Sequence, residues 1–414
     1  MTKIFINLSK GYKMQSYYIN AYKDLYNNYG IITYVFFDKN LSKELFNSDT
    51  KEYKFFYYDS KKDLLNQLKQ IKKEEIYFIN TFDEMLVLLL NEIKQELGFE
   101  VSKEYKAFRN KNLQRELLFL KFPETTVSYF DIDINDDFEN YTKLLSFPFI
   151  IKPTSGMQSA GVLLINSKND LENYIINTKN LLKNMGNRGI NDTRFIIEEF
   201  IDGEMYTVDY YVDNNGNFII TIITKVFLLN NLGIDDFGNY VRVSGDFTNL
   251  DIDLDKLKDF IKKHIKTFGI KDTFIHHEFK INSKNIFKTI ELNQRVGGYR
   301  LEMAKLNYDY NVLTSPLGIR NEFDNKSSMA IFIFYPKKTG VFKELNNKLL
   351  DKFKSLKSFN NLRFSDSYIG KTIGLTKDGY SNVAAIRIIN KDLEQFKKDY
   401  DFIEKNYNDL IILE

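Results

Sequence analysis

The segment that decides the fold reads FIHHEFKI at residues 274–281 and IFKTIELNQR at residues 286–295. Both halves alternate apolar and polar side chains, which predicts two β-strands joined by a short turn. Because successive side chains on a strand point to opposite faces, Glu291, Asn293 and Arg295 share one face. With an even number of turn residues, antiparallel pairing places Glu278 on that face and His276 beside it. The other face then collects Ile275, His277, Phe279, Ile281, Ile290 and Leu292.

Two carboxylates packed side by side repel each other unless a positive charge lies between them. A divalent cation with oxygen ligands, Mg²⁺, suits such a position and usually shares its coordination sphere with substrate phosphates. Arg295 would then face those phosphates. The alternative is a solvated strand face with surface ion pairs. The flexible backbone at Gly297 and Gly298, directly after the strand, favours close approach of a ligand.

A second segment, residues 152–162, reads KPTSGMQSAGV between two apolar stretches. One lysine is followed by a loop of small residues, whose backbone amides could hold phosphate oxygens. It is not a P-loop, because no G-K-[ST] follows and no helix is expected. Taken alone, such a segment is more often a flexible hairpin. A third segment, IEEFIDG at residues 197–203, could offer backbone groups to an adenine edge or be an exposed strand end.

Composition excludes several kinds of chemistry. The 414 residues include no cysteine, so disulfides, thiol nucleophiles and cysteine–zinc sites are excluded. The chain has three histidines. His264 is expected at the surface, and His277 is expected to pack on the apolar face. His276 could orient Glu278, line the substrate site or have a structural role. A net charge of +2 argues against binding of nucleic acid or membrane through bulk electrostatics. No signal peptide or membrane span is evident, which predicts a cytoplasmic protein.

The first hundred residues alternate strand and helix patterns, with strands near residues 3–8, 31–37 and 75–80 and helices near 15–29 and 83–97. This alternation predicts a parallel α/β sheet. The first turn has no GxGxxG, so ordinary dinucleotide binding is not expected there.

Taken in order, K-P-x-[small loop]-S-x-G-V, E-E-F-I-x-G and H-x-E…E-x-N-x-R-x-G-G resemble the ATP-grasp superfamily, and within it carboxylate–amine ligases of the L-amino-acid ligase type. The resemblance is densest from Phe147 to Arg300. It implies an α/β (α+β) chain with the ATP-grasp fold and four parts. These are a Rossmann-like pre-ATP-grasp domain (1–105), a small lobe (106–205), a large lobe (206–325) that clasps ATP with it, and a C-terminal subdomain (326–414).

The resemblance also implies roles for particular residues. Lys111 resembles the first phosphate lysine, with Asn110 in place of the usual acid and Lys106 as the competing candidate. Lys152 resembles the second phosphate lysine, with a catalytic role that it shares with Arg295. The remaining implied roles are the phosphate-covering loop (Ser155, Gly156, Ser159, Gly161), the adenine hinge (Glu198, Glu199, Phe200, Ile201), the metal ligands (Glu278, Glu291, Asn293) and substrate contacts (His276, Arg242, Gly298, Arg300).

The chain departs from the resembled pattern at the ribose site. Such families often have a glutamate two residues after the hinge glycine, where this chain has Met205. Either Glu204 substitutes for it or the ribose is bound differently. Arg242 is expected in a closing loop with Asn239, where it could pair with a substrate carboxylate.

The implied activity is an ADP-forming ligase that uses ATP and Mg²⁺, or Mn²⁺, to join a carboxylate and an amine through an acyl phosphate, with amino acids or small peptides as substrates. Expected partners are these small molecules, not nucleic acid or membrane, and a second copy in a homodimer. The alternatives are an ATP-grasp enzyme acting on a purine-pathway or bicarbonate-type carboxylate, and a non-catalytic ATP-binding protein.

Overall fold

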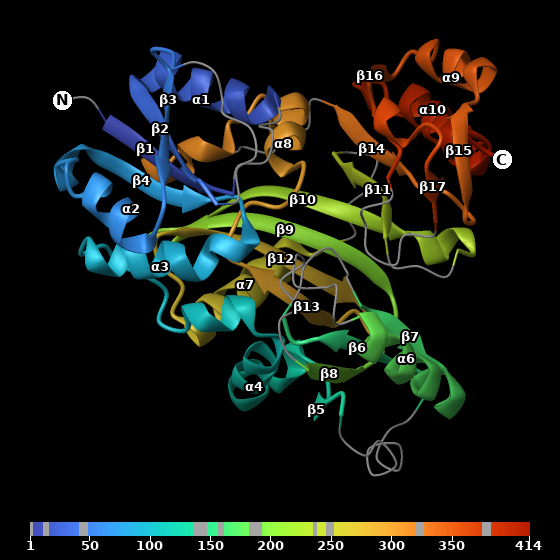
Figure 1. Cartoon of the computed structure of the whole chain (residues 1–414), viewed down its shortest axis with the longest axis horizontal. Coiled ribbons are helices and arrows are strands. Elements are labelled where there is room, and N and C mark those ends of the chain that lie inside the picture. The colour runs from blue at the N-terminus through green and yellow to red at the C-terminus, as the bar shows by residue number, and fades with distance from the viewer. Residues whose placement is uncertain are drawn as a thin grey trace.

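The structure is a computed structural model that describes residues 3–10, 16–40, 49–135, 147–155, 161–181, 193–234, 238–245, 252–319, 327–374 and 382–414. Three larger sheets organise the chain (Figure 1). No described helix is long and apolar enough to cross a membrane.

The N-terminal part is a parallel sheet with strand order β3-β2-β1-β4, as the strand and helix alternation predicts. Its strands are β1 (Lys3–Ser9), β2 (Ile31–Asp38), β3 (Tyr53–Tyr58) and β4 (Ile76–Thr81), and its helices are α1 (Ser16–Tyr29), α2 (Lys61–Leu68) and α3 (Val87–Glu96). From β1 the chain adds β2 and β3 on one side of the sheet and then β4 on the other side. The carboxyl ends of β1 and β4 therefore flank the point at which ligands bind in open α/β sheets. Residues Phe82 to Glu84 follow β4 directly at that edge.

A smaller antiparallel sheet has the order β5-β8-β6-β7. It contains β5 (Tyr129–Asp133), β6 (Phe149–Pro153), β7 (Leu163–Ile165) and β8 (Arg194–Glu199), with α4 (Lys111–Lys121) before it and α6 (Lys168–Leu181) between β7 and β8. Apolar residues of this sheet and of α6 form a core of their own. Figure 1 shows this lobe, in green, set apart below the central sheet.

The central sheet has eight strands in the order β13-β12-β9-β10-β11-β14-β18-β16. Its first part contains β9 (Glu204–Val212), β10 (Phe218–Leu228), β11 (Asn239–Ser244), β12 (Thr273–Ile281) and β13 (Phe287–Asn293), with α7 (Leu254–Phe268) before β12 and α8 (Arg300–Tyr308) after β13. Apolar side chains of α7 pack with β9 and β12 in one core. The face that α7 covers is therefore closed, and the other face is left to build a site.

The C-terminal strands continue the same sheet, because β14 (Ser328–Phe334) pairs with β11 and β18 (Ala384–Asn390) pairs with β14. The other C-terminal elements are β15 (Gly340–Leu345), α9 (Asn347–Lys354), β16 (Phe359–Phe364), β17 (Thr372–Ile373), α10 (Leu393–Lys405) and β19 (Ile411–Leu413). β17, β15 and β19 form a separate small sheet. One hydrophobic core joins this region to the N-terminal part.

Candidate functional site

Three adjacent strands present alternate side chains to one face. β12 lies between β9 and β13, and Glu278 of β12 lies opposite Glu291 of β13. Glu278 and Glu291 therefore share a face, as the sequence predicts. The premise of an even turn is wrong, because residues 282–286, an odd number, separate the paired residues Ile281 and Phe287, and a β-bulge restores the shared face. The face carries Met205, Thr207 and Asp209 from β9, His276, Glu278 and Lys280 from β12, and Glu291 and Asn293 from β13.

The pairing of β12 with β13 contains a β-bulge. Thr289 and Glu291 lie opposite consecutive residues of β12, so Ile290 is the extra residue. A bulge re-aims the side chains around it. Ile290 consequently lines the cavity on the polar face, and the expectation that it shares the apolar face with Leu292 is wrong. Thr289 takes that apolar side and is fully buried.

The polar face lines a central cavity of about 720 Å³. Every part of the chain contributes to its wall. Phe82 and Glu84 come from the N-terminal part, Lys152 from the small lobe and Arg363 from the C-terminal strands. The wall also includes apolar side chains from several elements, namely Ile150, Val162, Phe200, Ile201, Met205, Leu228 and Ile290. A cavity with charged groups at one part and apolar groups at another suits a ligand with both kinds of surface.

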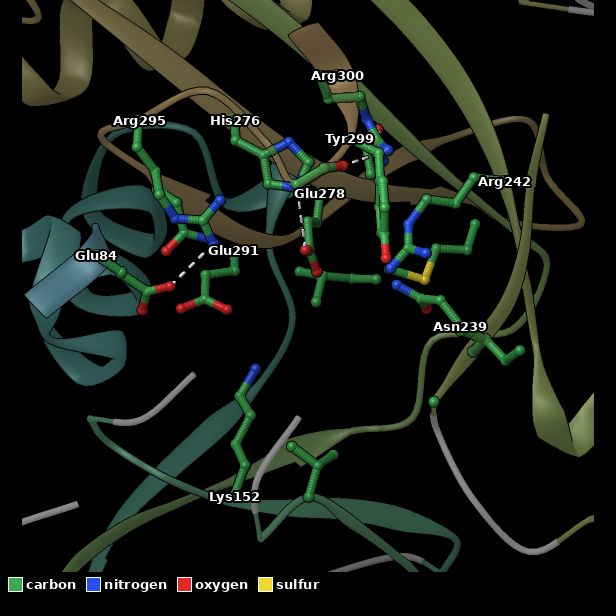
Figure 2. Close-up of a pocket in the computed structure, with 18 of the residues that line it drawn as sticks. Glu84, Lys152, Asn239, Arg242, His276, Glu278, Glu291, Arg295, Tyr299 and Arg300 are labelled. Carbon is green, nitrogen blue, oxygen red and sulfur yellow. Dashed lines mark hydrogen bonds and ion pairs between the residues drawn. The ribbon is translucent and has the colours of Figure 1, made fainter. Parts of the chain in front are cut away.

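His276 joins two carboxylates. Its Nδ1 lies 2.7 Å from Asp209 Oδ1. Its Nε2 lies 3.3 Å from Glu278 Oε1 (Figure 2). Burial acts to lower the pKa of His276, but the charge of Asp209 outweighs it and raises the pKa above its usual value. Burial acts to raise the pKa of Glu278, yet hydrogen bonding and charge from His276 lower it to about 2. Glu278 is therefore ionised at neutral pH, with the His276 ring as its hydrogen-bonding neighbour.

The residues present fit a magnesium ion. Glu278 and Glu291 supply carboxylates, and Asn293 Oδ1 is a buried acceptor without a hydrogen-bond partner among the described residues. In the part of the chain that the structure describes, no three His, Asp or Glu side chains gather as a metal cluster. Two carboxylates and an amide oxygen, completed by ligand phosphates, match the way Mg²⁺ is usually bound.

Lys111, and not Lys106, faces the cavity. Lys111 is the first residue of α4, and its Nζ lies 2.8 Å from Glu291 Oε1. Lys106 is exposed and is not part of the cavity wall. Asn110 caps α4 by accepting a hydrogen bond from the Leu113 backbone, which fixes where Lys111 begins the helix.

A buried carboxylate holds the second lysine. Lys152 Nζ lies 2.7 Å from Glu198 Oε2, and Arg115 Nε donates to Glu198 Oε1 at 2.7 Å. Burial acts to raise the pKa of Glu198, but Arg115 and Lys152 outweigh it and lower the pKa. The Glu198 side chain thus positions Lys152. Any contact between Glu198 and the adenine base of a nucleotide would therefore be made by the Glu198 backbone.

Arg295 is oriented by the N-terminal part. Its Nη2 lies 3.0 Å from Glu84 Oε2 (Figure 2). Arg109 contacts the other carboxylate oxygen of Glu84. Burial acts to lower the pKa of Arg295, but Glu84 outweighs it and raises the pKa. The guanidinium is therefore a fixed positive charge on the cavity wall, near Glu291.

Arg242 lies on β11 and not in the closing loop that the sequence predicts, because Asn239–Ser244 pairs with β10 and β14. Its guanidinium lies 5.4 Å from the ring centroid of Tyr299, whose ring also has Arg387 at 5.5 Å. Arg242 Nη1 is buried and has no hydrogen-bond partner among the described residues. A cation with an unused donor at the cavity wall suits an anionic ligand group.

Arg300 is held more firmly. Its Nη2 donates to Thr207 Oγ1 at 2.9 Å and its Nη1 to the Gly298 carbonyl at 3.1 Å. Burial lowers the pKa of Arg300 to about 10. Gly298 and Arg300 both line the cavity.

The predicted hinge and loop are only partly at the cavity. Ser155 and the hinge residues Glu199, Phe200 and Ile201 line it. Gly161 does not; its carbonyl accepts a hydrogen bond from Tyr174. Gly156 and Ser159 lie outside the described residues.

Glu204 is not part of the cavity wall, so the structure does not support it as a substitute ribose ligand. Its carboxylate binds the Tyr206 hydroxyl at 2.7 Å and the Lys225 ammonium. Met205, the next residue, does line the cavity.

Three site residues are not predicted from the sequence: Glu84, Asp209 and Tyr299. Glu84 follows the carboxyl end of a parallel strand, which is a recognised place for ligand-binding groups. Asp209 lies directly opposite His276, a pairing that the sequence alone does not show. Tyr299 has a positive φ of 66° immediately before α8.

The expectation that His264 lies at the surface is wrong. His264 is fully buried, with Nδ1 2.7 Å from the Phe260 carbonyl and Nε2 2.7 Å from Thr289 Oγ1. His277 is buried on the apolar face, as predicted, and stacks on Phe260. This cluster lies behind the strand that carries Glu278.

Residues 145–302 match the family described as the ATP-grasp domain. The protein therefore has an ATP-grasp domain, and its fold is the ATP-grasp fold, as the sequence resemblance implies. No curated protein matches the chain in sequence.

Solved structures show which ATP-grasp proteins the whole chain is similar to. An L-amino acid ligase from Bacillus licheniformis aligns with a TM-score of 0.77 and 16% identity, over 100% of this chain and 99% of its own. An N5-carboxyaminoimidazole ribonucleotide synthetase from Thermotoga maritima aligns with a TM-score of 0.62 and 12% identity, over 100% of both chains. A biotin carboxylase domain from Hydrogenobacter thermophilus, solved with MgADP and bicarbonate, aligns with a TM-score of 0.63 and 13% identity, over 94% of this chain and 87% of its own.

Proposed function

We propose that the protein is an ATP-dependent, ADP-forming carboxylate–amine ligase that acts on amino acids or small peptides. The single observation that carries the proposal is the convergence of Glu278, Glu291 and Asn293 with three cations, Lys111, Lys152 and Arg295, on one cavity. Carboxylate and amide oxygens suit a magnesium ion, and the cations suit the phosphates bound to it.

The proposed reaction needs no protein nucleophile. A substrate carboxylate oxygen attacks the γ-phosphorus of ATP, and the bond between that phosphorus and the bridging oxygen breaks to release ADP. The amine then attacks the carbonyl carbon of the acyl phosphate. The bond from that carbon to the phosphate oxygen breaks, and the amine loses its proton, giving an amide and inorganic phosphate.

The chain's own residues contribute position and charge. Lys152 and Arg295 are oriented by their ion pairs with Glu198 and Glu84, so little reorganisation accompanies charge transfer. Glu278, Glu291 and Asn293 would hold Mg²⁺, which when bound neutralises charge on the β- and γ-phosphates. Arg242 is suited to a substrate carboxylate.

A second candidate is a carboxylation that uses bicarbonate, favoured by the similarity to the Thermotoga and Hydrogenobacter structures over most of the chain. The test is ADP release from Mg–ATP with pooled amino acids, with and without bicarbonate, followed by mass spectrometry of the products. The proposal expects ADP and a dipeptide-type amide without bicarbonate. ADP release that requires bicarbonate would support the second candidate, and nucleotide binding without turnover would support a binding protein.

A further inference from the structure

One cation of the cavity wall, Lys280, has no part in the proposed reaction. It lies two residues after Glu278 on β12 and on the same face of the sheet. At the rise of a β-strand, their Cα atoms are about 7 Å apart. Lys280 therefore stands between the phosphate-binding end of the cavity and the hinge.

Lys280 is anchored to the hinge by one hydrogen bond. Its Nζ donates to the Ile201 carbonyl at 2.8 Å and lies 5.0 Å from the ring centroid of Phe200. An ammonium group has three donors and no acceptor. The ammonium therefore has donors beyond the one given to Ile201, and the Lys280 side chain is part of the cavity wall.

The neighbour of Lys280 on β9 is Met205, directly opposite it in the ladder. Met205 offers only a weak thioether acceptor to a ligand hydroxyl. The carboxylate next to it, on Glu204, is bound to Tyr206 and Lys225 and is not part of the cavity wall. At this position the wall therefore presents a hydrogen-bond donor in place of a carboxylate.

In a nucleoside triphosphate the ribose lies between the base and the phosphates. If the base occupies the apolar hinge region and the phosphates lie near Glu278 and Lys152, the ribose falls beside Lys280. We propose that Lys280 donates a hydrogen bond to a ribose hydroxyl oxygen and thereby distinguishes ribonucleotides from deoxyribonucleotides. This inference rests on the proposed function.

Burial supports a ligand contact of this kind. Lys280 is half-buried in the cavity wall, so its ammonium gives up part of its hydration there. A ribose oxygen would replace some of that lost hydration.

The experiment measures binding by calorimetry, independently of turnover. The probes are the magnesium complex of the non-hydrolysable imido analogue of ATP and its 2′-deoxy and 3′-deoxy forms. The wild type is expected to bind at least one deoxy form about 10- to 100-fold more weakly than the ribonucleotide, as for loss of a hydrogen bond to a charged group. Lys280→Met should bind the ribonucleotide as weakly as the wild type binds that deoxy form. The affinity for the deoxy form itself should be the same in Lys280→Met and in the wild type.

Two further variants keep the result interpretable. Lys280→Gln retains a neutral donor for the Ile201 carbonyl and should lose most of the same discrimination. The matched control is Lys288→Met: Lys288 lies opposite Lys280 on β13, donates to the Thr126 carbonyl and is not part of the cavity wall. It should bind all three nucleotides as the wild type does.

Equal weakening of all three nucleotides by Lys280→Met would show that Lys280 only supports the hinge, and an unchanged affinity for all three would show no contact. Either result overturns the inference and leaves the proposed ligase intact. Absence of nucleotide binding by the wild type would overturn the proposed function and the inference with it.

Discussion

Glu278 and Glu291 lie directly opposite each other on β12 and β13, and each is contacted by a basic side chain of its own. His276 contacts Glu278, and Lys111 contacts Glu291. Two facing carboxylates repel each other, and these separate partners offset part of that repulsion. Figure 2 shows the two carboxylates facing the same space above Lys152.

The first prediction concerns this pair and the neighbouring guanidinium. Glu291→Ala and Arg295→Ala should each lower the rate of ADP release by about 10²- to 10³-fold, because each removes one group that would stabilise the transferring phosphoryl. Both should retain the fold, which circular dichroism and thermal unfolding would check.

Glu204→Ala is the control for these variants, because its carboxylate is not part of the cavity wall and binds Lys225 and Tyr206 instead. It should release ADP at the wild-type rate. Turnover close to that of the wild type in Glu291→Ala or Arg295→Ala would contradict the assigned roles.

The second prediction assigns Arg242 to a substrate carboxylate. Arg242→Ala should raise the KM for the carboxylate substrate by about 10- to 100-fold, the usual effect of losing a hydrogen bond to a charged group, and leave the KM for ATP unchanged. Steady-state kinetics with each substrate varied in turn would measure both. An equal rise in both constants would indicate a general disturbance of the cavity, and no rise would remove Arg242 from substrate binding.

The third prediction follows from the close packing around Gly297. A methyl group at this residue would lie 2.6 Å from His276 Cε1 and 2.9 Å from Arg300 Cγ. Gly297→Ala should therefore displace His276 and lower the free energy of unfolding by about 1–3 kcal/mol, as overpacking generally does. Urea unfolding would measure it.

Gly298→Ala provides the control for stability, because a methyl group there meets no atom within 4 Å. Its free energy of unfolding should stay within about 0.5 kcal/mol of the wild type. Equal stability of the two variants would show that the packing around Gly297 relaxes without cost.

Strand alternation correctly predicts that Glu291 and Asn293 share a face, because the period of two is a property of the backbone itself. That Glu278 faces the same side depends on the β-bulge, because the turn of residues 282–286 has an odd number of residues and not the expected even number. The same rule failed for Ile290, because a β-bulge adds one residue to β13 and the sequence carries no unambiguous mark of it. Local patterns also could not reveal that Glu84 would orient Arg295, since these residues are 211 positions apart in the chain.

The prediction that His264 lies at the surface is wrong for a related reason. Lysines surround it in the sequence, but on α7 it shares the buried side with Ile261 and Phe268. The helical period places it inward, against Thr289. Roles that rest on resemblance, such as Lys152 with the phosphates, stay predictions until a nucleotide complex is examined.

The last prediction is a pH dependence of stability that arises from His264. Burial lowers the pKa of its imidazole from 6.5 to about 4. Between these two values the unfolded chain binds a proton at this residue that the folded protein does not bind. The contribution of His264 to stability is therefore complete above pH 6.5 and is lost as the pH falls towards 4, by up to about 3 kcal/mol. Urea unfolding between pH 4 and 7 would measure the slope. His264→Gln, which cannot titrate, should show a shallower slope in this window, and identical slopes for the two proteins would contradict the assignment.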